Sequence, residues 1–158
     1  MKEFKWPSSA PVSAAILVID DDPLLRQFVE LVLSQAGYNV SSAGTGALGL
    51  KALQHARWDL LLLDVEMPDM SGLDLLSLLR RYQKAPVKVM MMTARRDAET
   101  VTNSMITGAD GYLLKPFDPD GLLLRVGAML RAKSECEHAA DPLAAAGATG
   151  AAARPTTH

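Results

Sequence analysis

The chain has 158 residues, of which 49% are hydrophobic and 22% charged, enough for one globular domain with a sizeable core. Its net charge of −2 gives no broad basic field, so direct nucleic-acid binding is not expected. The single cysteine excludes an intrachain disulfide, and no apolar run approaches the roughly 20 residues of a membrane-spanning helix. These features predict a cytoplasmic protein that does not enter a membrane.

Composition divides the chain into three segments. Residues 1–13 are polar, contain Pro7 and Pro11, and predict a flexible N-terminal extension. Residues 14–132 alternate short apolar runs with amphipathic stretches and predict one folded domain. Residues 133–158 are rich in alanine and have too few large apolar side chains to offset the entropy of ordering. We therefore predict an Ala-rich tail or linker that is disordered.

The central segment alternates strand-like and helix-like patterns five times. The apolar runs predict strands at Ala15–Ile19, about 38–42, 60–63, 87–92 and Gly111–Leu114. The amphipathic stretches predict helices from Pro23 to Gly37, over a stretch ending near His55, at 73–82, at about 98–107 and at about 119–132. Apolar runs too short for helices, separated by helices, predict a parallel sheet covered on both faces. The expected fold class is α/β, with a doubly wound five-stranded parallel sheet.

Local signals mark the ends of two predicted helices. Asp22 followed by Pro23 is typical of an N-cap with proline in the first helical turn. Gly37 is expected to end the same helix, because glycine readily adopts the left-handed conformation of a helix C-terminus. Either Asp69 or Ser71 can cap the helix that begins near residue 73.

Polar side chains follow four of the predicted strands. Asp20 and Asp21 follow the first strand, Asp64 the third, Thr93 the fourth and Lys115 the fifth. In an open α/β sheet, ligands bind at the carboxyl ends of the strands, so these side chains should converge. Clustered carboxylates repel one another unless a cation is present, and Mg²⁺ prefers such oxygen ligands. The pattern predicts a site that binds a divalent metal and accepts a phosphoryl group on Asp64.

These residues, with the motifs around them, resemble the receiver domain of two-component response regulators. The resemblance covers about residues 14–132, and the motifs that carry it are Asp20-Asp21, Asp64 with Met67-Pro68 and Ser71-Gly72, Thr93-Ala94, and Lys115-Pro116-Phe117. It implies a flavodoxin-like, CheY-like (βα)5 fold with strand order 2-1-3-4-5. It also implies a domain that promotes only its own phosphorylation and dephosphorylation, rather than an enzyme for other substrates.

The resemblance implies a role for each residue of the site. Asp64 is the phosphoacceptor, and Lys115 supplies a cation to the phosphoryl group. The cofactor is Mg²⁺, with Mn²⁺ as a substitute. Its implied ligands are Asp21, Asp64 and the main-chain carbonyl of Glu66, whereas Asp20 assists through water.

Three further residues have implied roles in switching and in placing the lysine. The hydroxyl of Thr93 bonds a phosphoryl oxygen, and the aromatic ring of Tyr112 then turns inward to fill the space that Thr93 vacates. The bond before Pro116 is cis, which turns Lys115 toward the site. The face that repacks is formed by residues about 98–107, Gly111–Leu114 and about 119–132.

The resemblance also implies partners. They are a sensor histidine kinase or histidine phosphotransfer protein, and a downstream protein target. Phosphorylation-dependent homodimerisation through the switching face is a further expectation, with Asp110 and Arg125 as candidate contacts. Gly111 and Gly127 replace charged or larger residues that are common in such dimers, which argues against this pairing.

Three alternatives concern the whole protein. The tail is too short for a winged-helix domain, so the leading interpretation is a stand-alone receiver. The main rival is an N-terminal receiver fragment of a larger DNA-binding or enzymatic response regulator. A remote alternative is a haloacid dehalogenase-type phosphatase, which also has an aspartate nucleophile and Mg²⁺. That family needs a second aspartate two residues after the nucleophile, where this chain has Glu66. In a receiver, Glu66 is expected to form an ion pair with Arg95 that slows hydrolysis of the phosphoryl group.

Overall fold

The computed structural model describes residues 14–82, 87–94 and 98–139. In this part of the chain, five parallel strands form one sheet in the order β2-β1-β3-β4-β5. The strands are β1 (Ala15–Ile19), β2 (Asn39–Ala43), β3 (Leu60–Asp64), β4 (Lys88–Thr93) and β5 (Gly111–Leu114). The predicted fold class and strand order are confirmed. The predicted N-terminal extension and most of the predicted tail, residues 1–13 and 140–158, lie outside the described residues.

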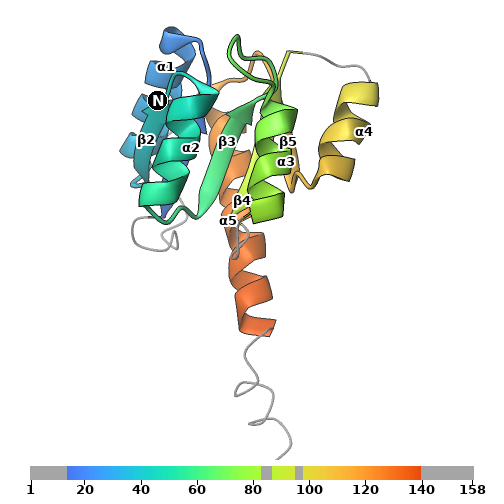
Figure 1. The fold of residues 1–158 in the computed structure, drawn as a ribbon. Helices are drawn as coiled ribbons and strands as arrows, with labels where there is room; N and C mark the ends of the chain where they lie inside the picture. The colour runs from blue at the N-terminus through green and yellow to red at the C-terminus, as the bar shows by residue number, and fades with distance from the viewer. Residues whose placement is uncertain (1–13, 83–86, 95–97, 140–158) are drawn as a thin grey trace, which may run out of the picture.

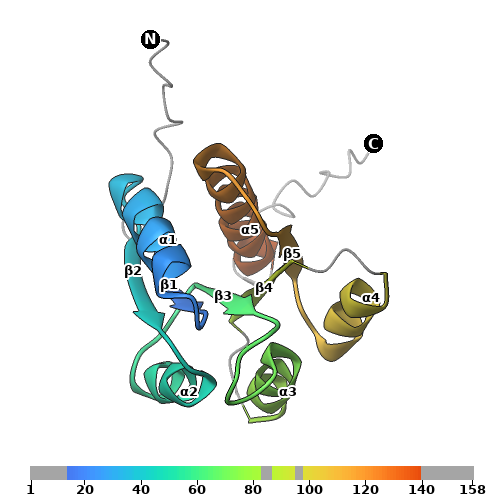
Figure 2. The ribbon, with the colours of Figure 1, turned by 90° about the horizontal axis from the view of Figure 1, so that it is seen from above.

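A helix follows each strand, and the helices cover both faces of the sheet (Figure 1). They are α1 (Pro23–Gln35), α2 (Gly46–His55), α3 (Gly72–Tyr82), α4 (Ala98–Thr107) and α5 (Pro119–Ala139). Seen from above, α1 and α5 lie on one face, whereas α2 and α3 lie on the other, with α4 beside α3 (Figure 2). This is the doubly wound arrangement that right-handed crossovers produce.

The core consists of two layers, one on each face of the sheet, because successive side chains of a strand point to opposite faces. Leu17 and Leu61 are fully buried in the layer under α2 and α3. Ile16 and Leu60 are fully buried in the layer under α1 and α5. Burial on both faces explains why the central strands are uninterrupted apolar runs. The edge strand β2, by contrast, has mostly exposed side chains.

Both ends of α1 follow from the local sequence. Asp22 Oδ1 accepts a hydrogen bond from the Leu24 amide at 2.9 Å, which confirms the predicted N-cap. At the other end, Gly37 has a φ of +96°, and the amide of Tyr38 donates to the carbonyl of Leu33 at 3.1 Å. Tyr38 therefore completes the end of the helix, and β2 begins one residue later than predicted.

Helix α5 ends later than predicted. It continues to Ala139, so residues 133–139 are helical rather than part of the tail expected from residue 133. The run from Arg131 to Ala139 contains neither glycine nor proline, so no residue in it breaks the helix. In Figure 1 this end of α5 projects beyond the sheet.

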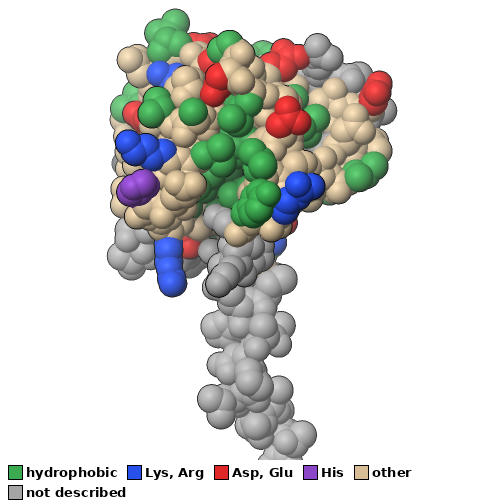
Figure 3. Space-filling model, in the orientation of Figure 1, with side chains coloured by type: hydrophobic (Ala, Val, Ile, Leu, Met, Phe, Trp, Pro, Cys, Tyr) green, Lys and Arg blue, Asp and Glu red, His purple; other side chains and the backbone are tan. Residues whose placement is uncertain are grey.

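Hydrophobic and charged side chains are distributed unevenly over the face formed by α2 and α3. Hydrophobic side chains gather over its middle, and Asp and Glu side chains gather in its upper part, toward the carboxyl ends of the strands (Figure 3). None of the helices in the described residues is long and apolar enough to span a membrane. The acidic end of the sheet is where the predicted site residues lie.

Candidate functional site

A cleft of about 440 Å³ lies at the carboxyl edge of the sheet. Strands β1, β3, β4 and β5 all end there, so residues from separate sequence motifs meet. The cleft is lined by Asp21, Asp64, Glu66, Met67, Pro68, Thr93, Ala94 and Lys115. The structure therefore brings together the polar residues that the sequence predicted to converge.

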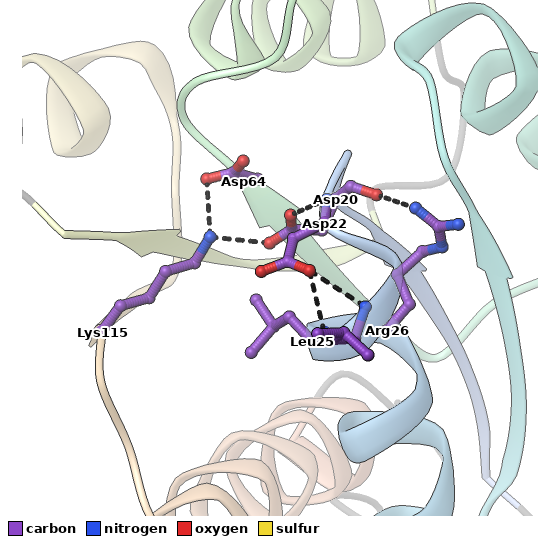
Figure 4. Close-up of polar contacts among 7 residues, drawn as sticks. Asp20, Asp22, Leu25, Arg26, Asp64 and Lys115 are labelled. Carbon is purple, nitrogen blue, oxygen red and sulfur yellow. Dashed lines mark hydrogen bonds and ion pairs between the residues drawn. The ribbon is translucent and has the colours of Figure 1, made fainter.

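Asp20 lies beside the cleft, is fully buried (0% exposed), and is held from several directions. Its Oδ2 accepts from Lys115 Nζ at 2.7 Å, and its Oδ1 accepts from the Asp22 amide at 2.9 Å. Its main-chain carbonyl accepts from the Arg26 guanidinium at 2.7 Å (Figure 4). These contacts fix the carboxylate so that one of its oxygens faces the lysine.

Lys115 lies between two carboxylates. Besides its contact with Asp20, its Nζ lies 3.1 Å from Asp64 Oδ1 (Figure 4). Burial lowers the pKa of the Lys115 ammonium, but hydrogen bonds and charge interactions with both carboxylates outweigh burial, so the pKa is raised. The lysine is therefore a fixed positive charge at the cleft. The bond between Lys115 and Pro116 is cis, as predicted.

Asp64 is the last residue of β3 and is only 4% exposed. Burial, followed by the charge of Asp20, raises the pKa of the Asp64 carboxyl to about 6, although Lys115 acts in the opposite direction. At neutral pH the carboxylate is ionised in surroundings that disfavour its charge. A further cation nearby would stabilise this ionised carboxylate.

Three carboxylates lie close enough to share such a cation. Oxygen atoms of Asp20, Asp21 and Asp64 are within 4.8 Å of one another, and Lys115 offsets only part of their charge. Mg²⁺ takes oxygen ligands, typically one or two carboxylates together with several waters. This donor set fits a hard divalent ion. Glu66, whose main-chain carbonyl is a predicted ligand, lines the same cleft.

Thr93 and Tyr112 point to the same face of the sheet. In the register of β4 with β5, Tyr112 pairs with Met91, and Thr93 is two residues beyond Met91. Side chains two residues apart on a strand share a face. Thr93 is buried at the cleft, and Tyr112 is partly buried against the core layer under α2 and α3. The structure thus places both residues on one face of the sheet, and their predicted roles in switching stay predictions.

Asp69 has a role that local sequence rules did not reveal. It caps α2 rather than α3: its Oδ1 accepts from the Gly46 amide and its Oδ2 from the Ala47 amide, each at 3.1 Å. The hydrogen bond from Gly46, together with that from Ala47, lowers the pKa of the Asp69 carboxyl. Ser71 caps α3 instead, and its Oγ accepts from the Leu73 amide at 3.2 Å. The Asp69 contact joins segments 23 residues apart, so only the packing of the helices discloses it.

Two other predicted contacts have different outcomes. Asp110, a candidate dimer contact, is engaged within the domain, where its Oδ2 accepts from Arg80 and from a main-chain amide of β4, each at 2.8 Å. Arg125, the other candidate, is exposed on α5. The predicted ion pair of Glu66 involves Arg95, which lies outside the described residues.

A five-stranded doubly wound sheet with an aspartate cluster and a lysine at its carboxyl edge defines the class of receiver domains. The model of the response regulator receiver domain family matches residues 16–127, and the chain belongs to this family. The family places the chain in two-component signalling, as predicted. It is also the finding that favours a receiver over a haloacid dehalogenase-type phosphatase.

Relatives and solved structures agree with this assignment. The DNA-binding response regulator MtrA of Mycolicibacterium smegmatis is 40% identical over 116 residues, which cover 73% of this chain and 50% of that protein. The transcriptional regulatory protein KdpE of Mycobacterium tuberculosis is 37% identical over 128 residues, 81% of this chain and 56% of that protein. The structure of the chemotaxis protein CheY4 of Vibrio cholerae aligns with a TM-score of 0.71 at 34% identity, covering 75% of this chain and 99% of that chain. This chain thus spans about half the length of the curated relatives that it matches.

Proposed function

We propose that this receiver domain is a phosphorylation-controlled switch in which Asp64 accepts a phosphoryl group from a histidine kinase or a histidine phosphotransfer protein. The observation that carries the proposal is the position of Asp64 in an acidic cleft, with Lys115 Nζ 3.1 Å from its Oδ1. Membership of the receiver family supports the same role.

In the proposed reaction, an oxygen of Asp64 attacks the phosphorus of a phosphohistidine. The bond from phosphorus to the histidine nitrogen breaks, and an acyl phosphate forms on Asp64. Such transfers are catalysed mainly by positioning and by electrostatic stabilisation. Lys115 supplies positive charge beside the nucleophile, and Asp20 holds the lysine there at 2.7 Å. Thr93, which lines the cleft, offers its hydroxyl to a phosphoryl oxygen.

The same cleft fits a divalent cofactor. Asp21, Asp64 and the main-chain carbonyl of Glu66 would hold Mg²⁺, or Mn²⁺ in its place, with Asp20 assisting through water. When bound, the ion offsets the negative charge of the carboxylates and of the phosphoryl group. The raised pKa of Asp64 supports this assignment, because burial and the charge of Asp20 disfavour its ionisation when no metal is bound.

The proposed output is a change of the face formed by α4, β5 and α5. Thr93 would move toward the phosphoryl group, and Tyr112, on the same face of the sheet, would turn inward. Exposed hydrophobic side chains suit this face for a protein target, since Ile106 of α4 is 79% exposed and Leu124 of α5 is 68% exposed. A second copy of the phosphorylated domain is the alternative occupant.

The domain can serve in two settings. It can act alone on a partner protein, or it can be the receiver of a larger regulator. The two relatives named as DNA-binding or transcriptional regulators favour the second setting, because the chain aligns with about half of each. Sequencing the gene on both sides of the 158 codons distinguishes the settings, since a longer reading frame supports the larger regulator.

Intact-mass analysis after incubation with acetyl phosphate tests the proposed phosphorylation. The wild-type protein should gain the mass of one phosphoryl group with Mg²⁺ and none with EDTA. Asp64→Asn should gain none, whereas Asp74→Asn, which changes an exposed aspartate in the first turn of α3, should behave as wild type. If the wild type gains no mass from acetyl phosphate or from a phosphorylated histidine donor, the proposal fails.

A further inference from the structure

The loop between β3 and α3, residues 65–71, forms one wall of the cleft. It contributes Glu66, Met67 and Pro68 to the lining. The loop is anchored beside β4, where the amide of Val65 donates to the carbonyl of Met92 at 3.0 Å. It is anchored again where it enters α3, because the amide of Gly72 donates back to the carbonyl of Val65 at 2.9 Å. Both anchors lie at the base of the loop, so neither fixes its outer part.

Asp69 and Met70 form a third anchor in the outer part of the loop. The Asp69 carboxylate receives two hydrogen bonds of 3.1 Å, from the amides of Gly46 and Ala47 in the first turn of α2. Met70 packs directly over Gly46, where an added Cβ would lie 2.7 Å from the methionine sulfur. The negative charge of Asp69 is also favourable at the positive end of the α2 dipole. The outer part of the loop is thus seated on a neighbouring helix.

A second side chain, from the residue that precedes α2, also caps this helix. Thr45 is the N-cap residue, and its Oγ1 accepts from the Leu48 amide at 3.2 Å. Thr45 and Asp69 therefore both satisfy amides in the first turn of α2. Of these two caps, Asp69 is the one that belongs to the loop and so links that turn to the wall of the cleft.

We propose that Asp69 is a positioning residue for the phosphorylation site. By tying the loop to α2, it holds the main-chain carbonyl of Glu66 where the cofactor ligand is expected. This inference rests on the proposed function, because it takes the Glu66 carbonyl as a metal ligand. The first turn of α2 becomes part of the support of the site.

The test compares Asp69→Ala with Thr45→Ala in the full chain. Each variant removes one side-chain cap of α2, so both should lower the thermal midpoint by similar amounts. Mg²⁺ binding is measured directly, from amide chemical shifts during titration with MgCl₂. Loss of a group hydrogen-bonded to a metal ligand typically weakens metal binding about 10- to 100-fold; Asp69 acts on the Glu66 carbonyl through the loop, so Asp69→Ala should raise the Mg²⁺ dissociation constant by about the lower figure, tenfold. Thr45→Ala should leave that constant within about twofold of wild type, since Thr45 bonds to an amide of α2 and the Asp69 bonds that tie the loop to α2 stay in place.

A kinetic readout separates positioning from a general loss of structure. For Asp69→Ala, the Mg²⁺ concentration that gives half-maximal phosphorylation by acetyl phosphate should rise, and the rate at saturating Mg²⁺ should fall much less. Asp69→Asn should be intermediate, because its amide oxygen still accepts one hydrogen bond. This conservative variant replaces Asp69→Ala if the alanine variant does not fold.

Each outcome decides the inference. Equal weakening of Mg²⁺ binding by Asp69→Ala and Thr45→Ala would mean that loosening α2 is sufficient, and would overturn it. Unchanged Mg²⁺ binding in the Asp69 variants would overturn it as well. If the wild type binds Mg²⁺ but is not phosphorylated, the proposed function fails, while the titration still decides the role of Asp69.

Discussion

The ammonium of Lys115 lies 2.7 Å from the carboxylate of Asp20, although the two residues are 95 positions apart in the sequence. Asp20 is fully buried, and the lysine side chain is 20% exposed. In such surroundings, the attraction between the two charges offsets the cost of removing them from water, and it does so only while both partners are present. The stability of the fold therefore depends on a lysine that lines the cleft and on the buried aspartate beside it.

Lys115→Met should destabilise the protein in metal-free buffer. The substitution leaves the carboxylates of Asp20 and Asp64 without their ammonium, and breaking a buried pair on one side should cost roughly 2–4 kcal/mol in the free energy of unfolding. Saturating Mg²⁺ should restore part of this loss. Urea unfolding with EDTA and with Mg²⁺ measures both effects, and Lys51→Met, at an exposed lysine of α2, is the control. Equal losses in the two variants would contradict the prediction.

The pKa of Asp64 predicts how stability depends on pH. Its value of about 6 in the folded protein exceeds the ordinary value of 3.8, so the folded state binds the proton more tightly between these values. Stability in metal-free buffer should therefore fall as the pH rises through this window. Asp64→Asn removes the ionisation, and after allowance for solvent at the open cleft it should add about 1–2 kcal/mol well above pH 6.

Urea unfolding in EDTA across this pH range measures the effect of Asp64→Asn. The gain in the free energy of unfolding should disappear near the ordinary carboxyl pKa of 3.8 and below it. A gain that is constant with pH would show that the effect has another cause than ionisation. The exposed-site variant Asp74→Asn should show no such gain.

Gly72 should tolerate no side chain, because it lies against the backbone that carries Asp64. An added Cβ would collide with the Asp64 carbonyl oxygen and lie 3.0 Å from the Cα of Val65, and neither backbone group can move freely. Gly72→Ala should therefore cost about 2–3 kcal/mol and slow phosphorylation. Gly127→Ala, within α5, meets only the flexible end of Arg131 at 3.3 Å and should add about 0.5–1 kcal/mol. Thermal unfolding compares them, and similar midpoints would count against the collision.

The arrangement of the site was predictable because its charged and hydroxyl side chains each follow an apolar strand of the sheet. Asp64 follows four leucines, and the carboxyl ends of parallel strands meet in a crevice whatever the details of packing. Asp21, Thr93 and Lys115 converge with it for the same reason. These residues are far apart along the chain, but the neighbouring parallel strands of the sheet bring them together.

The contacts that support the site were not predictable, because they depend on how helices pack. Asp69 satisfies the general rule for a cap, but it caps a helix 23 residues earlier in the sequence. Tyrosine is common in strands, yet the amide of Tyr38 donates a hydrogen bond to the last turn of α1. Local propensity identifies such groups as hydrogen-bonding partners but cannot choose between a near and a distant partner.

Arg80 joins α3 to the end of the sheet that lies opposite the cleft. Its Nε donates to the Gly108 carbonyl at 2.9 Å, its Nη1 to the Val87 carbonyl at 2.7 Å, and its Nη2 to Asp110 at 2.8 Å. Arg80→Met removes all three bonds, and we expect a loss of roughly 2–3 kcal/mol in the free energy of unfolding. Arg80→Lys should not restore it, because one ammonium cannot match the planar fork.

The control for Arg80 is Arg81→Met, an exposed neighbour in the last turn of α3, which should change stability by less than about 0.5 kcal/mol. Urea unfolding measures all three variants. Because Arg80 contacts the start of β4 and the turn before β5, far from the carboxyl ends of the strands, phosphorylation of Arg80→Met by acetyl phosphate should match wild type below its unfolding transition. Equal stability of Arg80→Met and Arg81→Met would contradict the prediction, because the three bonds of Arg80 would then be no stronger than its bonds to water in the unfolded protein.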